Sequence, residues 1–316
     1  MQAFASMSTH PSRKPAVFAL LALTLIWSSN WIVMKLAMLD SGPFNFSALR
    51  YAGGTAVLFL LLRLRGERLA PPPLGPTLLI GLTQTAGFTA LAQWALVHGG
   101  AGKTALLAYT MPFWTVLLAW AWLHERLRSL QVASLVLAAV GLLLVLQPWN
   151  AHVDLTSALM AIGGGMNWAV STVAAKRLFA RQGKALSPLR LTAWQMLVGT
   201  FFLVLLAGFV PERAVTWTPG FIAALTFNVV LASGLAWTLW LLVVQRLPAG
   251  VAGLSSLAIP VTGVLLAWAL LGERPNADEG AGIVIVALAL LLLLRASAAA
   301  PATAAPQSSA DAARRS

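Results

Sequence analysis

Long apolar runs alternate with short polar or proline-containing breaks along most of the chain. A helix needs about 20 apolar residues to cross the hydrocarbon core of a bilayer, and these runs have about that length. The pattern therefore predicts an all-α integral membrane protein with about ten transmembrane helices. Their predicted ranges are 16–39, 45–62, 75–97, 102–123, 129–147, 155–179, 188–210, 219–245, 249–271 and 278–294. Helix-breaking prolines stand in the gaps between these ranges, namely Pro71, Pro72, Pro73, Pro148, Pro211 and Pro248.

Composition supports the same class. The 316 residues are 59% hydrophobic and only 9% charged, whereas soluble domains carry about 25% charged residues. The ten ranges leave no room for a large extramembrane domain. The segment 1–15 is expected to be a cytoplasmic tail, and the Ala-, Ser- and Pro-rich segment 296–316 is expected to be disordered. The chain has no cysteine, so disulfides and cysteine-ligated metals are excluded.

Lysine and arginine are distributed unevenly between the two sides of the predicted membrane. If the N-terminus is cytoplasmic, sixteen of the 21 basic residues lie on the cytoplasmic side and five on the other. Short loops with an excess of Lys and Arg stay in the cytoplasm. Both termini are therefore predicted to be cytoplasmic. The net charge of +12 is explained by this bias, and no nucleic-acid partner is expected.

An internal repeat sets the predicted architecture. Residues 101–126 read AGKTALLAYTMPFWTVLLAWAWLHER, and residues 249–274 read AGVAGLSSLAIPVTGVLLAWALLGER. Pro112 aligns with Pro260 at an offset of 148, and the Glu-Arg pairs that end both segments align at the same offset.

A weaker echo joins the first and sixth spans, because Trp27 precedes Lys35 by eight residues and Trp168 precedes Lys176 by eight. The repeated unit is thus five helices, predicted over 16–147 and 155–295. Five is an odd number, so the two units enter the bilayer from opposite sides. Such inverted repeats are typical of secondary transporters.

These residues resemble the EamA-type branch of the drug/metabolite transporter superfamily. The resemblance rests on the sequence WSSNW at 27–31 with Lys35, on Leu49-Arg50, and on the Pro…Leu-Ala-Trp…Glu-Arg pattern of both halves. It implies ten helices in a five-plus-five inverted repeat, a bacterial inner-membrane location and export of amino acids or other small metabolites. It also implies a central cavity between spans 1, 3, 4, 6, 8 and 9. Ser28 stands where the family usually has glycine.

Charged residues limit the substrate. All nine acidic residues lie in predicted loops, tails or helix ends, whereas carboxylate-based proton antiporters use a carboxylate inside the membrane. A neutral, zwitterionic or weakly anionic substrate is therefore expected. Lys35 and Arg50 lie near the predicted outer boundary. They either attract a substrate carboxylate or have a structural role, by snorkelling or by pairing with Asp40. His98 is interpreted as an interfacial histidine.

Polar and aromatic residues of the spans are the candidate substrate-binding residues. They are Trp27, Asn30, Gln84, Trp94, Tyr109, Asn167, Trp168, Trp237 and Ser256. An amide inside the membrane must face protein or water, where it either binds substrate or joins helices. An indole-lined cavity favours hydrophobic or aromatic amino acids. Pro112 and Pro260 are expected to break their helices at matched positions near the site.

The sequence thus predicts a secondary transporter that exports amino acids or related neutral or zwitterionic compounds. A sugar-phosphate or nucleotide-sugar carrier is the alternative, although it would need Lys or Arg in the cavity for phosphate. An integral membrane enzyme is disfavoured, because the chain has no HExxH motif and no clustered aspartates. No catalytic residue, metal or cofactor is expected. Spans 5 and 10 are expected to face lipid or a second copy of the chain in a homodimer.

Overall fold

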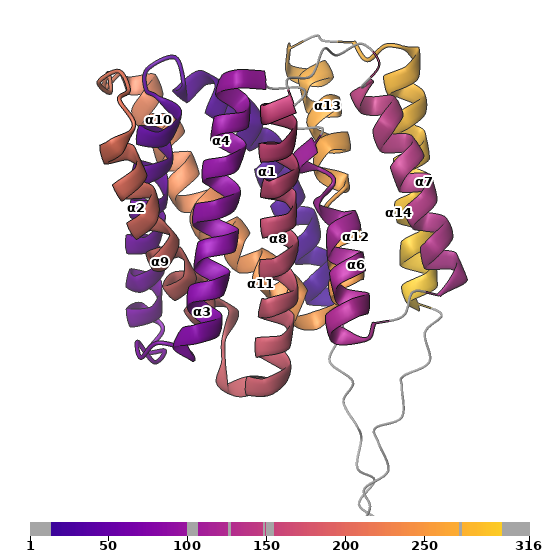
Figure 1. Ribbon diagram of the computed structural model, residues 1–316, viewed down its shortest axis with the longest axis horizontal. Helices are drawn as coiled ribbons and strands as arrows, with labels where there is room; N and C mark the ends of the chain where they lie inside the picture. The colour runs from indigo at the N-terminus through magenta and orange to yellow at the C-terminus, as the bar shows by residue number, and fades with distance from the viewer. Residues whose placement is uncertain are drawn as a thin grey trace, which may run out of the picture.

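The computed structural model describes residues 14–99, 107–125, 128–147, 149, 155–271 and 274–298, and its regular elements there are all helices. In chain order they are α1 (Lys14–Ala37), α2 (Pro43–Leu64), α3 (Leu74–Ile80), η1 (Gly81–Gly87), α4 (Phe88–Gly99), α6 (Met111–Leu123), α7 (Ser129–Leu146), α8 (Leu155–Gln182), η3 (Gly183–Ala185), α9 (Pro188–Phe209), α10 (Pro219–Phe227), η4 (Asn228–Leu235), α11 (Ala236–Arg246), α12 (Ala249–Ser255), α13 (Ala258–Leu271) and α14 (Ala277–Ala298). Figure 1 shows them side by side as a bundle, with α7 and α14 together at one edge.

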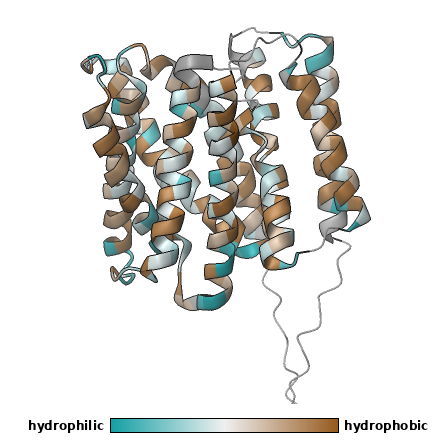
Figure 2. Cartoon of the chain, in the orientation of Figure 1, coloured by the Kyte–Doolittle hydropathy of each residue, from teal (hydrophilic) through white to brown (hydrophobic). Residues whose placement is uncertain are grey.

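Six helices in this described part are long and apolar enough to cross a membrane. They cover Pro15–Met34, Pro43–Leu64, Leu155–Gln182, Pro188–Phe209, Pro219–Arg246 and Ala249–Leu266, and shorter apolar helices cover Met111–Leu123 and Ser129–Val145. Hydrophobic residues run along the helices, while hydrophilic ones gather at their ends and in the connections (Figure 2). Large apolar side chains such as Phe18 and Phe209 are exposed on the outside. A surface of this kind requires an apolar solvent.

Helix ends follow local chemistry. α2, α9 and α10 each begin with proline, whose missing N–H is not needed in a first helical turn. The side chains of Ser187 and Thr218 cap α9 and α10 by accepting from the backbone N–H groups of Arg190 and Phe221. These three helices accordingly begin within about two residues of the predicted starts, whereas the predicted start of the span 102–123 lies outside the described residues. The predicted tails are shorter than expected where the structure describes them, because α1 already begins at Lys14 and α14 continues to Ala298. The rest of these tails, 1–13 and 299–316, lies outside the described residues.

Two long helical segments differ from the prediction of regular α-helix. α3, η1 and α4 form one continuous segment, as do α10, η4 and α11, and in each the middle part is π-helical. η1 packs closely on α9, because Gly81 lies against the backbone carbonyl of Gln195 and Thr85 lies against Gly199. A π-helical turn holds more residues than an α-helical turn. It therefore changes which residues share a helix face before and after it.

The sequence suggested that Pro112 and Pro260 interrupt the helices in which they lie. In the structure, neither proline bends a continuous helix. The chain turns before each of them: at residues 109–110 before α6, and at Ser256 and Leu257 between α12 and α13. Each proline then lies in the first turn of the following helix, where a missing N–H leaves no backbone carbonyl unpaired. The helix break therefore precedes the proline in both halves.

α7 and α14 pack tightly against each other. A Cβ on Gly282 would stand 2.7 Å from the Gly141 carbonyl oxygen, so glycine allows the close approach. Ser134 is buried and donates from Oγ to the Ala289 carbonyl oxygen at 2.7 Å. The outward side of the pair is apolar, with Val136 and Leu288 exposed. Contact of this side with a second copy of the chain stays a prediction.

Carboxylates connect segments that are far apart in the sequence. Glu212 accepts from the N–H groups of Phe44 at 2.9 Å and Asn45 at 2.8 Å, at the start of α2. Glu125 accepts from the N–H groups of Ala249 and Gly250 at 3.1 and 3.2 Å, at the start of α12. The free N–H groups of a helix N-terminus attract negative charge. These acids therefore fix helix ends and leave the interior of the bundle without their charge.

Candidate functional site

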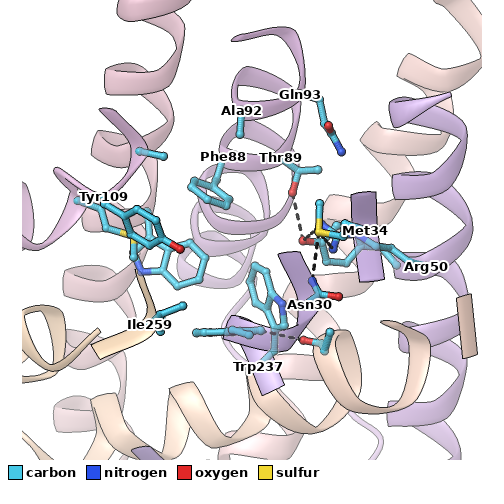
Figure 3. Close-up of a pocket in the computed structure, with 16 residues that line it drawn as sticks. Asn30, Met34, Arg50, Phe88, Thr89, Ala92, Gln93, Tyr109, Trp237 and Ile259 are labelled. Atoms are coloured by element: carbon cyan, nitrogen blue, oxygen red, sulfur yellow. Dashed lines mark hydrogen bonds between the residues drawn. The ribbon is translucent and has the colours of Figure 1, made fainter. Parts of the chain in front are cut away.

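A cavity of ≈ 120 Å³ lies in the middle of the bundle. Figure 3 shows its lining, with Gln93 at one end and Trp237 at the other. Residues of α1, α2, α4, α6, α8, η4, α11 and α13 contribute to it, so both halves of the chain build the wall. The resemblance implied a cavity between spans 1, 3, 4, 6, 8 and 9. The structure adds span 2, whose helix α2 contributes Arg50 and Tyr51.

Three indoles, Trp27, Trp168 and Trp237, line one end of the cavity, and a fourth, Trp240, packs against them. We call these four residues the indole cluster. The ring centroids of Trp27 and Trp168 lie 5.6 Å apart, and those of Trp168 and Trp237 lie 5.4 Å apart. Trp240 is fully buried behind them, with its centroid 5.6 Å from Trp168. The Trp27–Trp168 pair is edge-to-face and the two pairs of Trp168 with Trp237 and Trp240 are tilted. Aromatic pairs at such distances are favourable beyond the buried area alone. The cluster is therefore both a packed core and an apolar surface toward the cavity.

The π-helical segment η4 helps to orient this cluster. Trp27 donates from Nε1 to the Ala232 carbonyl oxygen in η4 at 3.1 Å. π-helical turns interrupt the regular hydrogen-bond ladder and often occur at functional sites. The bond fixes the indole of α1 against the second half of the chain.

A polar wall lies opposite, built around the guanidinium of Arg50. Arg50 donates from Nη1 to Asn228 Oδ1 at 3.2 Å and from Nη2 to Tyr51 Oη at 3.0 Å. Its Cζ lies 4.4 Å from the centre of the Tyr51 ring, a cation–π contact. Thr89 Oγ1 also donates to Tyr51 Oη, at 3.2 Å. The structure thus places a fixed positive charge at the cavity.

The structure shows neither of the two structural roles that the sequence suggested for Arg50, snorkelling and pairing with Asp40. Arg50 is only 8% exposed and therefore does not snorkel to an interface. Asp40 accepts from Thr218 Oγ1 at 2.9 Å instead of pairing with Arg50. Across the described residues, no carboxylate forms a hydrogen bond with this guanidinium. Arg50 is therefore a buried cation that faces the cavity, and the described part of the chain places no carboxylate against it.

Five of the nine candidate binding residues line this cavity together. They are Trp27, Asn30, Tyr109, Trp168 and Trp237. Tyr109 stands across the cavity from Arg50 in Figure 3. It lies in the turn before α6, so the helix break itself places the phenol at the cavity.

The other candidates lie elsewhere. Asn167 donates to the Gly163 carbonyl oxygen at 2.8 Å, and Ser256 donates to the Gly253 carbonyl oxygen at 2.7 Å, so both bond within their own segments. Gln84 is buried in η1 away from the lining. Trp94 packs its ring against Phe44, with centroids 5.7 Å apart. Pro112 and Pro260 are buried next to the helix breaks and do not line the cavity. The side chains of Lys35 and His98 lie outside the described residues.

Several lining residues were not among the candidates, notably Met34, Thr89 and Gln93 in addition to Arg50 and Tyr51. Thr89 and Gln93 are four residues apart on α4, a spacing that marks one helix face. The sequence analysis pointed to Gln84 and Trp94 of the same span. The π-helical turn of η1 separates the face of Gln84 from the face of Thr89.

A second cavity of ≈ 510 Å³ lies beyond Gln93, where the α1–α2 and α9–α10 connections meet. Its lining includes Phe44, Trp94, Glu212 and Arg213. Gln93 lines both cavities and donates from Nε2 to Ser47 Oγ at 2.8 Å. The central cavity therefore adjoins the second one at its Gln93 end, while the indole cluster closes the opposite end.

Apolar helices around an internal cavity that both halves of the chain line are typical of membrane transport proteins. The sequence model of the EamA-like transporter family matches residues 14–147 and again residues 155–295, and the chain belongs to this family. It is a multi-pass membrane protein of a transporter family.

Individual relatives agree with this assignment. The chain is 25% identical over 265 residues to the uncharacterized transporter YoaV of Bacillus subtilis, covering 82% of this chain and 89% of that protein. It is 26% identical over 286 residues to a protein of Salmonella typhimurium named probable amino-acid metabolite efflux pump, covering 86% and 92% of the two chains. A solved crystal structure superposes with a TM-score of 0.79 at 22% identity, covering 91% of this chain and 99% of the other. That structural likeness concerns the fold.

Proposed function

We propose that this protein is a secondary transporter that exports amino acids or related zwitterionic metabolites across a bacterial inner membrane. One observation carries the proposal: a central cavity that joins an indole surface to a buried guanidinium, with both halves of the chain contributing. An amino acid with an apolar side chain has the complementary groups, an anionic carboxylate and an apolar body. The efflux pump of Salmonella typhimurium is named for the same substrate class.

The alternatives have less support. A phosphate dianion needs several cationic groups, and Arg50 alone carries a charge among the described residues that line the cavity. Lys176 donates to the carbonyl oxygens of Leu247 and Gln245, at 2.6 and 3.3 Å, and does not line the cavity. These features favour a carboxylate over a sugar phosphate. The family and its relatives favour transport over an enzymatic activity.

We further propose ten transmembrane spans in two inverted five-helix units, 16–147 and 155–295. Residues that correspond in the two units meet each other in the structure. Thr55 Oγ1 lies 3.1 Å from Thr200 Oγ1 at an offset of 145 residues. Trp27 contacts Trp168 at an offset of 141 residues, which is also the offset between Lys35 and Lys176. Contacts between equivalent positions are what a pseudo-twofold axis in the membrane plane produces.

Opposite insertion of the two units has its own support. Ser187, the N-cap of α9, donates from Oγ to Glu67, while Glu212 accepts from the start of α2. Glu67 and Glu212 are 145 residues apart, as are the first residues of α2 and α9, Pro43 and Pro188. Each acid therefore binds the start of the equivalent helix in the other unit. Such a reciprocal arrangement places the two acids at opposite ends of the antiparallel pair α2 and α9.

Cysteine labelling tests this topology. The native chain has no cysteine, and Ala70 and Ala214 are exposed in the α2–α3 and α9–α10 connections. In intact cells, we expect a membrane-impermeant maleimide to label Ala214→Cys and to leave Ala70→Cys unlabelled until the membrane is opened, because basic residues hold the α2–α3 connection in the cytoplasm. Labelling of both variants from the same side would contradict the inverted arrangement.

Reconstitution tests the proposed substrate class. The purified protein in liposomes is expected to catalyse saturable exchange of labelled L-phenylalanine, L-tryptophan or L-leucine across the membrane. It is expected not to transport glucose 6-phosphate. Protein molecules that insert into the liposomes in the opposite orientation also contribute to the measured exchange, because alternating access works in both directions. Empty liposomes and liposomes with the Trp168→Ala variant are the controls. Saturable exchange of the sugar phosphate without exchange of any amino acid would replace the proposal by its alternative.

A further inference from the structure

Two strong hydrogen-bond donors of the cavity share a poor acceptor. Asn30 donates from Nδ2 to Met34 Sδ at 3.1 Å, and Arg50 donates from Nη1 to the same sulfur at 3.5 Å. A thioether sulfur is only a weak acceptor, whereas a guanidinium is a charged donor. Figure 3 shows Asn30, Met34 and Arg50 gathered on one wall of the cavity.

The remaining partners of Arg50 are neutral. Its other hydrogen-bond acceptors are the Asn228 amide oxygen and the Tyr51 hydroxyl, and its Nε has no hydrogen-bond partner in the described part of the chain. A buried charge without a counter-ion is costly. A bound anion would lower this cost by placing a negative charge next to the guanidinium. The site is therefore suited to a ligand with an anionic group.

We propose that the Met34 sulfur holds the place of a ligand carboxylate, which binds between Arg50 and Asn30 and displaces the thioether. The inference rests on the proposed function, since it assigns the subsite that binds the carboxylate of the transported amino acid. Methionine is suited to the exchange because its unbranched, flexible side chain repacks at low cost. A carboxylate accepts two hydrogen bonds from a guanidinium and is the better partner.

The surroundings also fit the rest of an amino acid. Asn30 Oδ1 is buried and has no hydrogen-bond partner in the described part of the chain, so an acceptor is left for a ligand ammonium. Trp27 lies one helical turn before Asn30 on α1 and belongs to the indole cluster. The carboxylate subsite and the apolar surface are therefore within reach of one small molecule. The ligand class is an α-amino carboxylate with an apolar side chain.

A substrate-independent test places a carboxylate at the site by mutation. We expect Met34→Glu to raise the midpoint of thermal unfolding at pH 7 relative to Met34→Gln, because the new carboxylate pairs with Arg50. The same comparison is made in an Arg50→Gln background, and in an Arg50→Lys background where Arg50→Gln does not fold. The difference is expected to vanish with Arg50→Gln and to shrink with Arg50→Lys. Equal midpoints for Met34→Glu and Met34→Gln in the native background would overturn the proposal.

Ligand binding tests the same subsite directly. Binding of 3-phenylpropionate and of phenethylamine is followed by tryptophan fluorescence of the protein in nanodiscs. We expect 3-phenylpropionate to bind, and Arg50→Gln to weaken it roughly tenfold or more, the range of a charged hydrogen bond. Met34→Leu is expected to tighten it roughly threefold, since the thioether no longer competes. Binding of phenethylamine alone, or an unchanged affinity in Arg50→Gln, would contradict the assignment.

The two proposals fail separately. If Met34→Glu stabilises the protein and 3-phenylpropionate binds, but no amino acid is exchanged in liposomes, the carboxylate subsite stands and the amino-acid substrate is wrong. If amino acids are exchanged and neither Met34→Glu nor Arg50→Gln has the expected effect, the proposed transport stands and the carboxylate subsite is wrong.

Discussion

The Trp168→Ala variant is expected to lose transport and to unfold at a markedly lower temperature. Trp168 is 5% exposed and contacts Phe88 as well as the other three members of the indole cluster, so its ring fills the centre of the bundle. Replacing a buried tryptophan by alanine costs about 3–5 kcal/mol. The same change removes the apolar surface on which the side chain of the substrate is proposed to rest. Exchange per folded protein and the midpoint of thermal unfolding are the two measurements.

Two further variants separate packing from binding. Trp168→Phe keeps an aromatic ring in the cluster and is expected to recover most of the stability, with weaker substrate binding. Trp120→Ala removes an indole of α6 that is 62% exposed, and it is expected to leave the unfolding midpoint and transport close to native values. Native exchange rates in Trp168→Ala would show that the indole cluster is not part of the substrate path.

The Gly199→Ala variant is expected to be strongly destabilised although only one methyl group is added. A Cβ at Gly199 would stand 2.2 Å from the Thr85 Cβ and 2.9 Å from the Gly81 carbonyl oxygen. α9 would have to move away from η1, which would break the hydrogen bond from Thr85 Oγ1 to Gln195 Oε1 at 2.7 Å. Overpacking of this kind costs about 1–3 kcal/mol or more. Thermal unfolding of the purified protein measures it.

Gly208→Ala is the matched control, because Gly208 lies on the same helix and a Cβ there would meet nothing within 4 Å. Alanine also restricts the unfolded chain more than glycine does, so this variant is expected to gain about 0.4–1 kcal/mol. If both variants unfold at the same temperature, the close approach of α9 and η1 does not contribute to stability.

The positions of most helices were predictable, because the hydropathy of a segment depends only on the residues within that segment. The apolar runs indicated the helices, and the starting prolines Pro43, Pro188 and Pro219 mark helix starts close to the predicted ones. The resemblance to the EamA-type transporters is confirmed by the family match over both halves. The repeat of Pro112 in Pro260 also pointed to matched positions, although the helix breaks lie before these prolines.

The composition of the cavity was only partly predictable. Trp27, Asn30, Tyr109, Trp168 and Trp237 line it, whereas Asn167 and Ser256 satisfy their polar groups within their own segments. In a soluble helix, polar and apolar faces tell which side is buried. In a membrane helix, both the lipid-facing and the protein-facing sides are apolar, so periodicity does not separate them.

The sequence by itself determined that this chain is a helical membrane protein of the EamA-like transporter family, because run length, charge bias and motif spacing are local properties of the chain. Only the tertiary structure decided that Arg50 points into the cavity with Met34 and Asn30 beside it, and that η1 turns Gln84 away from it. From its position in the sequence, Arg50 was expected near the membrane boundary. That position does not show which side chains surround Arg50 in the folded protein. Its environment is set by α1, α4 and η4, which come together only on folding.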